Sequence, residues 1–421
     1  MQEPDATSPT ELVEDLFRRE YAHLVSALTR VLGPSNIELA EDVVHDALLR
    51  AMGAWRFGLP RDPKAWIIRT AHNRAIDIIR RERRHISLLP ELASTGALTD
   101  TIEAALAPSA DGANQLAMMF AVCDQGVAPE TQVTLILRLL CGLSPKEIGQ
   151  AFLVGTATID RRLSRGRRRL RELSALPDVD RLPDIETRRA SVLQALYLLF
   201  SEGYHGSNPK QPVRPFLCED ALRLNELLLE DRATTHPDVH ALAALFSFNI
   251  ARIATRVDEE GVFQPLEEQD RARWDRELIE RGMAHLARSA SGGMMSRWHA
   301  EAGIACEHAI APSVRETDWD RVVMLYDLLL QRGPSPVLAL NRALALAERD
   351  GVEEGRRALT DLDGEERLST YPFYWAARAD LERRASEHAA ARSSYEHAIA
   401  FARSPAERVS YERRLELLDR P

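Results

Sequence analysis

Two short helices joined by a tight turn are predicted over residues 143–171. Ser144 and Glu147 form a capping box, and Pro145 stands at the first helical position, so a helix begins here. After a turn that contains glycine, Thr156 caps a second helix. Its packed side is formed by Ile159, Leu163 and Leu170. The pattern predicts a helix-turn-helix, and the alternative is a plain helical hairpin.

The second of these helices is strongly basic. Seven arginines lie between residues 161 and 171, with no acidic residue among them. In a helix-turn-helix the second helix enters the major groove of DNA, where arginine can donate to base edges and phosphates. The residues expected to face DNA are Thr156, Thr158, Arg161, Arg162, Arg165 and Arg169.

Another basic helix is predicted to begin near residue 62, with Asp62 as its N-cap and Pro63 at the first helical position. Its apolar face is formed by Ile68, Ala71, Ala75, Ile78 and Ile79. The opposite stripe reads Arg69, Asn73, Ile76, Arg80 and Arg84, with Arg81 and Arg83 nearby. Arginine and asparagine on one face can contact phosphates and base edges together. A solvated helix end is the alternative, because arginine is also favoured there.

An amphipathic helix over residues 38–51 precedes this segment, and a Gly/Pro loop over residues 55–61 follows that helix. The loop carries Trp55 and Phe57 on either side of Arg56, and Arg61 follows them. Aromatic rings beside arginines can hold unstacked bases. The elements upstream therefore strengthen the case for nucleic-acid binding.

The composition indicates an all-α protein, because Leu, Ala, Arg and Glu outnumber the β-branched and aromatic residues that strands favour. The chain of 421 residues is long enough for roughly two to four domains. Its four cysteines lack the spacing of a disulfide framework or a zinc site. We expect a cytoplasmic protein that does not engage a membrane, because neither a signal peptide nor an apolar run of spanning length is found.

Charge is distributed unevenly along the chain. Residues 1–174 hold 22 basic and 22 acidic residues, so the whole net charge of −10 belongs to the remainder. DNA binding depends on local clusters rather than on net charge, and an acidic protein can still bind DNA. The division suggests two functional halves, and it motivates the hypothesis that the acidic half restrains the basic helices electrostatically.

Two segments resemble conserved regions of a known family. AEDVVHDALLRA, a short loop and DPKAWIIRTAHNRAIDIIRRERR resemble the second conserved region of bacterial RNA polymerase sigma factors of the extracytoplasmic-function group. LSPKEIGQAFLVGTATIDRRLSRGRRRLRE resembles their fourth conserved region, although Gly155 stands where many relatives carry proline. The resemblance implies an alternative sigma factor, which binds core RNA polymerase and directs transcription initiation at promoter DNA.

The resemblance also implies roles for individual residues. Docking on core RNA polymerase would use His45, Asp46, Leu49 and Arg50. Capture of the melted minus-ten promoter element would use Asn73, Asp77, Arg80 and Arg81, with a flipped base in the loop that contains Trp55, Arg56 and Arg61. Arg69 and Arg84 are added to the residues expected to bind DNA because they lie on the same stripe of the helix. The helix-turn-helix would read the minus-thirty-five element and touch the polymerase flap.

Four segments follow from these assignments. We predict a polymerase- and minus-ten-binding domain at residues 1–85, a linker at 86–114, a helix-turn-helix domain at 115–175 and an α-helical extension at 184–421. A Pro/Asp-rich hinge precedes the extension.

The extension is predicted to contain helical repeats. Small and aromatic residues with the spacing of a tetratricopeptide-type helix pair are Trp375, Ala379, Ala391, Tyr395 and Ala398. Stacked helix pairs offer a concave surface, so an unknown protein or peptide ligand is expected. Residues 197–204 and 255–275 resemble the extension of a multidomain subgroup of the same sigma factors, which implies regulation of sigma activity in cis.

No catalytic, metal or cofactor site is expected. His299, Cys306 and His308 lie in an Ala-rich helix and are assigned to packing, and the acidic residues between 258 and 270 lack the spacing of a calcium loop. We find no nucleophile elbow or phosphate loop and therefore expect that the protein is not an enzyme. Two alternatives to the sigma factor stay open: a stand-alone helix-turn-helix regulator with a repeat-type sensor, and a repeat scaffold with a degenerate N-terminus.

Overall fold

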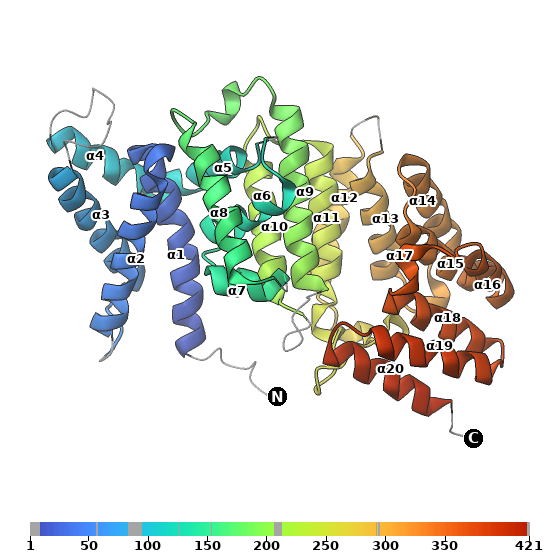
Figure 1. The fold of residues 1–421 in the computed structure, drawn as a ribbon. Helices are drawn as coiled ribbons and strands as arrows, with labels where there is room; N and C mark the ends of the chain where they lie inside the picture. Colours follow the sequence, from blue (N-terminus) through green and yellow to red (C-terminus); the bar gives the residue numbers. More distant parts are fainter. Residues whose placement is uncertain are drawn as a thin grey trace. The chain divides into compact units, whose positions relative to one another are not determined.

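The structure is a computed structural model that describes residues 9–55, 58–82, 95–124, 126–152, 154–205, 213–291, 293 and 295–418. The predicted all-α fold is confirmed, because the described residues form helices and no strand, apart from one isolated β-bridge between Val257 and Phe263. The chain divides into two compact units (Figure 1). The first comprises residues 1–199 and 230–234, and the second comprises residues 200–229 and 235–421.

The first unit is built from α-helices and three short 3-10 helices within the described ranges. Its elements are α1 (Pro9–Leu32), η1 (Pro34–Asn36), α2 (Ile37–Ala54), α3 (Pro63–Glu82), α4 (Thr95–Ala105), η4 (Pro108–Ala110), α5 (Asp111–Val122), α6 (Pro129–Leu139), α7 (Pro145–Phe152), α8 (Thr156–Arg171), η5 (Val179–Arg181) and most of α9 (Ile185–Tyr204). The extension predicted from residue 184 therefore starts one residue before α9. The boundary between the two compact units lies within α9, between Leu199 and Phe200.

Capping residues fix the starts of the two basic helical segments. Asp62 Oδ1 accepts from the Ala65 amide at 2.9 Å at the start of α3. Before α7 the predicted capping box is present: the Glu147 amide donates to Ser144 Oγ at 3.2 Å, and the Ser144 amide donates to Glu147 Oε2 at 2.7 Å. The N-cap predicted for α8 was wrong by one position, because the extended backbone of Gly155 precedes the helix and Thr156 is its first residue.

The helices of the first unit pack around α1, which contacts α2, α3, α4, α5 and α6. Ala71 and Ala75 of α3 are buried as predicted. Ile76, which the sequence placed on the outward stripe of that helix, is buried as well, because the buried face includes Ile67 and is turned slightly from the predicted one. Helix α4 occupies part of the stretch predicted to be a linker, and its Ile102 is fully buried.

The second unit is a succession of helices. Its elements are the end of α9, α10 (Pro215–Glu230), α11 (Pro237–Ala251), η6 (Ile253–Thr255), η7 (Leu266–Glu268), η8 (Arg271–Arg273), α12 (Arg276–Ser289), α13 (Arg297–Ile310), η9 (Val314–Glu316), α14 (Trp319–Arg332), α15 (Pro336–Asp350), α16 (Val352–Thr360), α17 (Glu366–Ser369), α18 (Pro372–Arg384), α19 (His388–Phe401) and α20 (Pro405–Leu417).

Helices that follow one another in this unit pack together, as the pairs α15 and α16, and α18 and α19, show in Figure 1. Small residues occupy the contacts: Ala379 and Ala391 are fully buried, and Tyr395 fills the space beside them with 1% of its surface exposed. Such contacts are what a repeat of helix pairs requires. The tetratricopeptide assignment itself stays a prediction.

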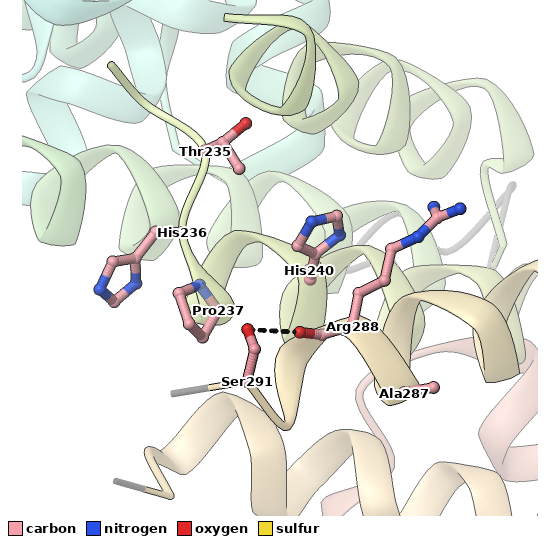
Figure 2. A pocket seen from close by; sticks show the side chains of 7 residues that line it. All are labelled: Thr235, His236, Pro237, His240, Ala287, Arg288 and Ser291. Carbon is pink, nitrogen blue, oxygen red and sulfur yellow. Dashed lines mark hydrogen bonds between the residues drawn. The ribbon is translucent and has the colours of Figure 1, made fainter. Parts of the chain in front are cut away.

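A pocket of about 380 Å³ lies in the second unit beside the start of α11 (Figure 2). It is lined by Thr235, His236, Pro237, His240, Ala287, Arg288 and Ser291. Next to it, His240 Nδ1 lies 3.0 Å from Nδ1 of the buried His285. Burial, followed by the charges of His240, Arg281 and Arg288, lowers the pKa of His285 to about 4. Burial, and after it the charge of Arg288, also lowers the pKa of His240. The two rings can share one hydrogen bond.

Gly355 of α16 sets the approach of α15. A Cβ atom at this position would lie 2.4 Å from Ala347 Cβ and 2.9 Å from the Ala343 carbonyl oxygen, and neither atom can move aside without a shift of the helix. We predict that Gly355→Ala lowers the free energy of unfolding by about 1–3 kcal/mol, the usual cost of overpacking. Urea unfolding measures it. Gly333→Ala is the matched control, because nothing lies within 4 Å of the added atom; equal effects of the two changes would contradict the packing account.

Candidate nucleic-acid interface

The residues predicted to dock on polymerase lie along the outer side of α2. His45, Leu49 and Arg50 are exposed, and Leu49 has 58% of its surface in solvent. Asp46 is held in place by two arginines: Arg50 Nε lies 3.0 Å from Asp46 Oδ2, and Arg74 Nε of α3 lies 2.9 Å from the same oxygen. The structure therefore brings the four residues together on one helix surface, with Asp46 tied to α3.

Two further apolar residues that the sequence analysis did not select are exposed in α2 and in the loop after it. Met52 of α2 is 59% exposed, and Leu59 in the following loop is 56% exposed. Leu49 and Met52 are three residues apart and so are neighbours on the helix. Large apolar side chains exposed together mark interaction sites in soluble proteins. The spacing was visible in the sequence, but exposure depends on which face of α2 packs on α1.

The loop after α2 is anchored by aromatic packing. The ring of Trp55 lies 5.5 Å from that of Phe17 and 5.7 Å from that of Trp66. Its indole nitrogen is buried and finds no partner among the described residues. Trp55, predicted to contact DNA, is thus half-buried, whereas Arg61 of the same loop is exposed. Arg56 lies outside the described residues.

The predicted DNA-facing side of α3 is open to solvent where it is described. Arg69, Asn73 and Asp77 are exposed and recur at intervals of four residues along one face. His72 Nδ1 lies 3.3 Å from Asn73 Oδ1, a contact that orients the Asn73 amide. The side chains of Arg80 and Arg81, and the whole of Arg84, lie outside the described residues.

The arginines of α8 fall into two groups. Arg161 and Arg165 are exposed, with Arg162 and Thr158 half-buried beside them and Thr156 exposed at the helix start. The packed residues Ile159, Leu163 and Leu170 are buried as predicted. Arg169 of the predicted stripe is engaged within the protein, where it forms ion pairs with Asp124 and Glu172. Fewer residues of α8 are therefore available to contact DNA than the sequence predicted, because Arg169 is paired within the protein.

The second group of α8 arginines turns toward acidic residues of α2. Glu41 is buried, with 5% of its surface exposed. Its Oε2 lies 2.6 Å from Arg167 Nη2, and its Oε1 accepts from Arg138 Nε of α6 and from the Tyr21 hydroxyl of α1, both at 2.8 Å. The pKa of the Tyr21 phenol is raised well above its usual value, first by burial and then by the charge of Glu41.

The buried carboxylate of Glu41 thus joins four helices, α1, α2, α6 and α8. A weaker surface pair, Arg171 with Glu38 at 3.3 Å, links α8 and α2 again. The two basic modules of the sequence therefore belong to one packed unit. Sequence reasoning missed Glu41; the available signal was an acidic residue at a buried position of an amphipathic helix.

Loss of the Glu41 charge should destabilise the first unit. In Glu41→Gln the guanidinium groups of Arg138 and Arg167 lose their counter-charge in a buried site, which typically costs about 3–5 kcal/mol. Urea unfolding followed by circular dichroism measures the change. Asp42→Asn is the control, because Asp42 is the next residue on α2 and is exposed, so a change within about 0.5 kcal/mol is expected. A loss below 1 kcal/mol in Glu41→Gln would show that the network does not hold the helices together.

Other kinds of site find no support in the part of the chain that the structure describes. It contains no group of three or more His, Cys, Asp or Glu side chains arranged to hold a metal ion. His299 acts in the capping box of α13, where its Nδ1 accepts from the Ser296 amide at 3.2 Å. None of the helices in the described ranges is both long and apolar enough to cross a membrane.

Comparison with known proteins places the N-terminal segment. Residues 16–85, which contain most of α1 together with α2 and α3, match sigma-70 region 2. Residues 188–290 match a family of unknown function, DUF6596. No solved structure matches the chain.

Two relatives extend the comparison. The chain is 35% identical over 395 residues to the uncharacterized protein R00370 of Rhizobium meliloti. The aligned region covers 91% of this chain and 92% of the relative. The chain is also 28% identical over 148 residues to the ECF RNA polymerase sigma factor SigW of Bacillus subtilis, and this aligned region covers 34% of the chain and 78% of the relative. The region 2 match and the second relative support a sigma-factor role in RNA polymerase binding and transcription initiation. The chain therefore belongs to the same family as protein R00370. Its region 2 match and its similarity to SigW support a sigma-70 family member.

Proposed function

We propose that the protein is an alternative sigma factor of the extracytoplasmic-function type, which binds core RNA polymerase and directs it to a two-part promoter. The observation that carries the proposal is the exposed surface of α2, where Leu49 and Met52 lie beside Asp46 and Arg50 inside the region 2 match. A regulator that acts on DNA alone has no need of such a surface. We also propose that the protein catalyses no covalent step.

Polymerase binding would use the apolar pair as its centre. Exposed large apolar side chains supply binding energy when a partner covers them, and charged neighbours set the orientation of the partner. Asp46 suits the second role, because Arg50 and Arg74 fix its carboxylate. His45 lies one turn from Leu49 on the same helix and completes the proposed surface.

Promoter contacts would come from two exposed faces. The α3 face offers Arg69 and Asn73 to the minus-ten element, and the outer face of α8 offers Arg161 and Arg165 to the minus-thirty-five element. The ion pairs of α8 support the assignment of DNA contacts to Arg161 and Arg165, because Arg167 and Arg169 are already paired with carboxylates of the protein. If all seven arginines between residues 161 and 171 were free, they would bind DNA phosphates without regard to base sequence.

The C-terminal unit would modulate this activity in cis, through a protein or peptide ligand of its helical repeats. Two facts support the idea: the relative R00370 shares nearly the full length of the chain, and the net charge of −10 lies beyond residue 174. If the acidic residues restrain the basic helices, added salt should raise promoter binding at first instead of only lowering it.

Removal of the apolar pair should weaken polymerase binding without harm to the fold. We predict that Leu49→Ser combined with Met52→Ser raises the dissociation constant for purified core RNA polymerase at least tenfold, a loss of about 1.4 kcal/mol or more. Biolayer interferometry with the full chain measures it. Leu417→Ser is the matched control, because Leu417 of α20 is 52% exposed. Equal affinity of the double variant and the control would remove the main support for the sigma-factor proposal.

Loss of the outer α8 arginines should weaken promoter binding by the polymerase complex. Arg161→Ala with Arg165→Ala removes two cationic contacts, so the slope of log affinity against log salt should become shallower by about two. Electrophoretic mobility shifts over a salt series report this slope. Arg367→Ala, at an exposed position of α17, should leave it unchanged. If the double variant kept the slope of the unaltered protein, α8 would not be a DNA-binding helix.

A further inference from the structure

Three arginines of the second unit gather around aromatic rings at the segment that follows α11. The guanidinium carbon of Arg256 lies 3.8 Å from the ring centroid of Tyr204. Those of Arg252 and Arg271 lie 5.7 and 4.6 Å from the ring centroid of Trp274. Stacking on rings holds a guanidinium in a fixed plane and leaves its N–H groups free to donate sideways.

No carboxylate neutralises these three arginines within the described ranges. Their hydrogen bonds go to neutral atoms instead: Arg252 Nε donates to Gln269 Oε1 at 3.1 Å, and Arg271 Nη1 donates to the Ala311 carbonyl oxygen at 2.8 Å. Arg256 Nη2 lies 3.4 Å from Nδ1 of His205. By contrast, Arg413 of the same unit pairs with both Asp258 and Glu260. Asp258 and Glu260 thus lie close to Arg256 in sequence, but they pair with Arg413.

Several polar atoms of the cluster are buried and lack a partner in the described part of the chain. They are Arg256 Nε, Arg271 Nη2, His308 Nδ1 and the Tyr204 hydroxyl. These atoms belong to side chains from three separate segments, the end of α9, the segment after α11 and α13. A buried donor without an acceptor costs free energy, so a cluster of them indicates that a partner is missing.

Electrostatics point the same way. Burial, and after it the charges of Arg256 and Arg271, lower the pKa of Arg252. Burial followed by the charges of Arg252 and Arg271 lowers the pKa of His308 to about 4. Burial together with Arg256, Arg252 and Arg403 also lowers the pKa of His205. Arg252, His308 and His205 thus each lie near at least two further arginine charges.

We propose that Arg252, Arg256 and Arg271 bind an oxyanion of the phosphate class. A dianion would neutralise most of the local charge, and its several oxygens could accept from all three guanidinium groups at once, whereas a carboxylate has only two. Neutral His308 can donate one further hydrogen bond. The phosphate group could be free or part of a phosphorylated small molecule, since both offer the same oxygens. The site does not depend on the sigma-factor proposal.

Calorimetric titration of the full chain tests the proposal with inorganic phosphate and pyrophosphate as probes. Sodium chloride and acetate at equal ionic strength serve as references. We expect saturable binding of at least one phosphate probe, with one site per chain, and at least tenfold weaker binding in Arg252→Gln and in Arg256→Gln. Tighter binding of pyrophosphate would favour a phosphorylated small molecule, and tighter binding of phosphate would favour the free ion. Arg276→Gln, at an exposed position of α12, should bind like the unaltered chain.

A second readout needs no substitution in the cluster. Bound anion should offset the charges of Arg252 and Arg271, so the pKa of His308, followed by NMR of histidine-labelled protein, should rise by one unit or more at saturating phosphate. This measurement still decides the question if either variant fails to fold. Phosphate and pyrophosphate that bind no better than chloride, or that bind equally well to both folded arginine variants, would overturn the proposal.

Discussion

The buried carboxylate of Glu41 is the interaction on which the first unit depends. One side chain of α2 receives hydrogen bonds or ion pairs from Tyr21 of α1, Arg138 of α6 and Arg167 of α8. A charge in a buried site is tolerated only when its partners are held in good geometry, so the network fixes how these helices meet. It also decides which arginines remain outside. With Arg167 turned inward and Arg169 and Arg171 in ion pairs, the exposed Arg161, Arg165 and Arg168 are left on the outer side of α8.

Much of this arrangement could be predicted from local sequence signals. The capping residues Asp62 and Ser144 gave the correct starts of α3 and α7, and the apolar spacing in α8 identified Ile159, Leu163 and Leu170 as buried. These features depend on neighbours within one helix. The network around Glu41 could not be predicted, because Arg138 lies 97 residues further along the chain and only tertiary packing brings the two together. The exposure of Met52 is also a tertiary property, and it was missed for the same reason.

The two units treat arginine differently. In the first unit, Arg138 and Arg188 lie away from solvent and are paired with the carboxylates of Glu41 and Asp124. In the second unit, Arg413 is paired in the same way, yet Arg252, Arg256 and Arg271 stack on aromatic rings and have no counter-charge among the described residues. Pairing inside the protein stabilises a fold, whereas unpaired cations in a partly buried site suit a ligand from outside. If the C-terminal unit binds a small anion, the concentration of that anion could regulate the activity of the protein.

The most direct test of the account is run-off transcription with purified core RNA polymerase and the full chain on a pool of genomic promoter fragments. The account predicts transcripts that start at discrete sites only when the protein is added, because the exposed surface of α2 recruits polymerase and α3 and α8 select the promoter. An absence of polymerase-dependent initiation, together with tight binding of duplex DNA by the free protein, would contradict it. Helices α7 and α8 would then belong to a regulator that acts without polymerase.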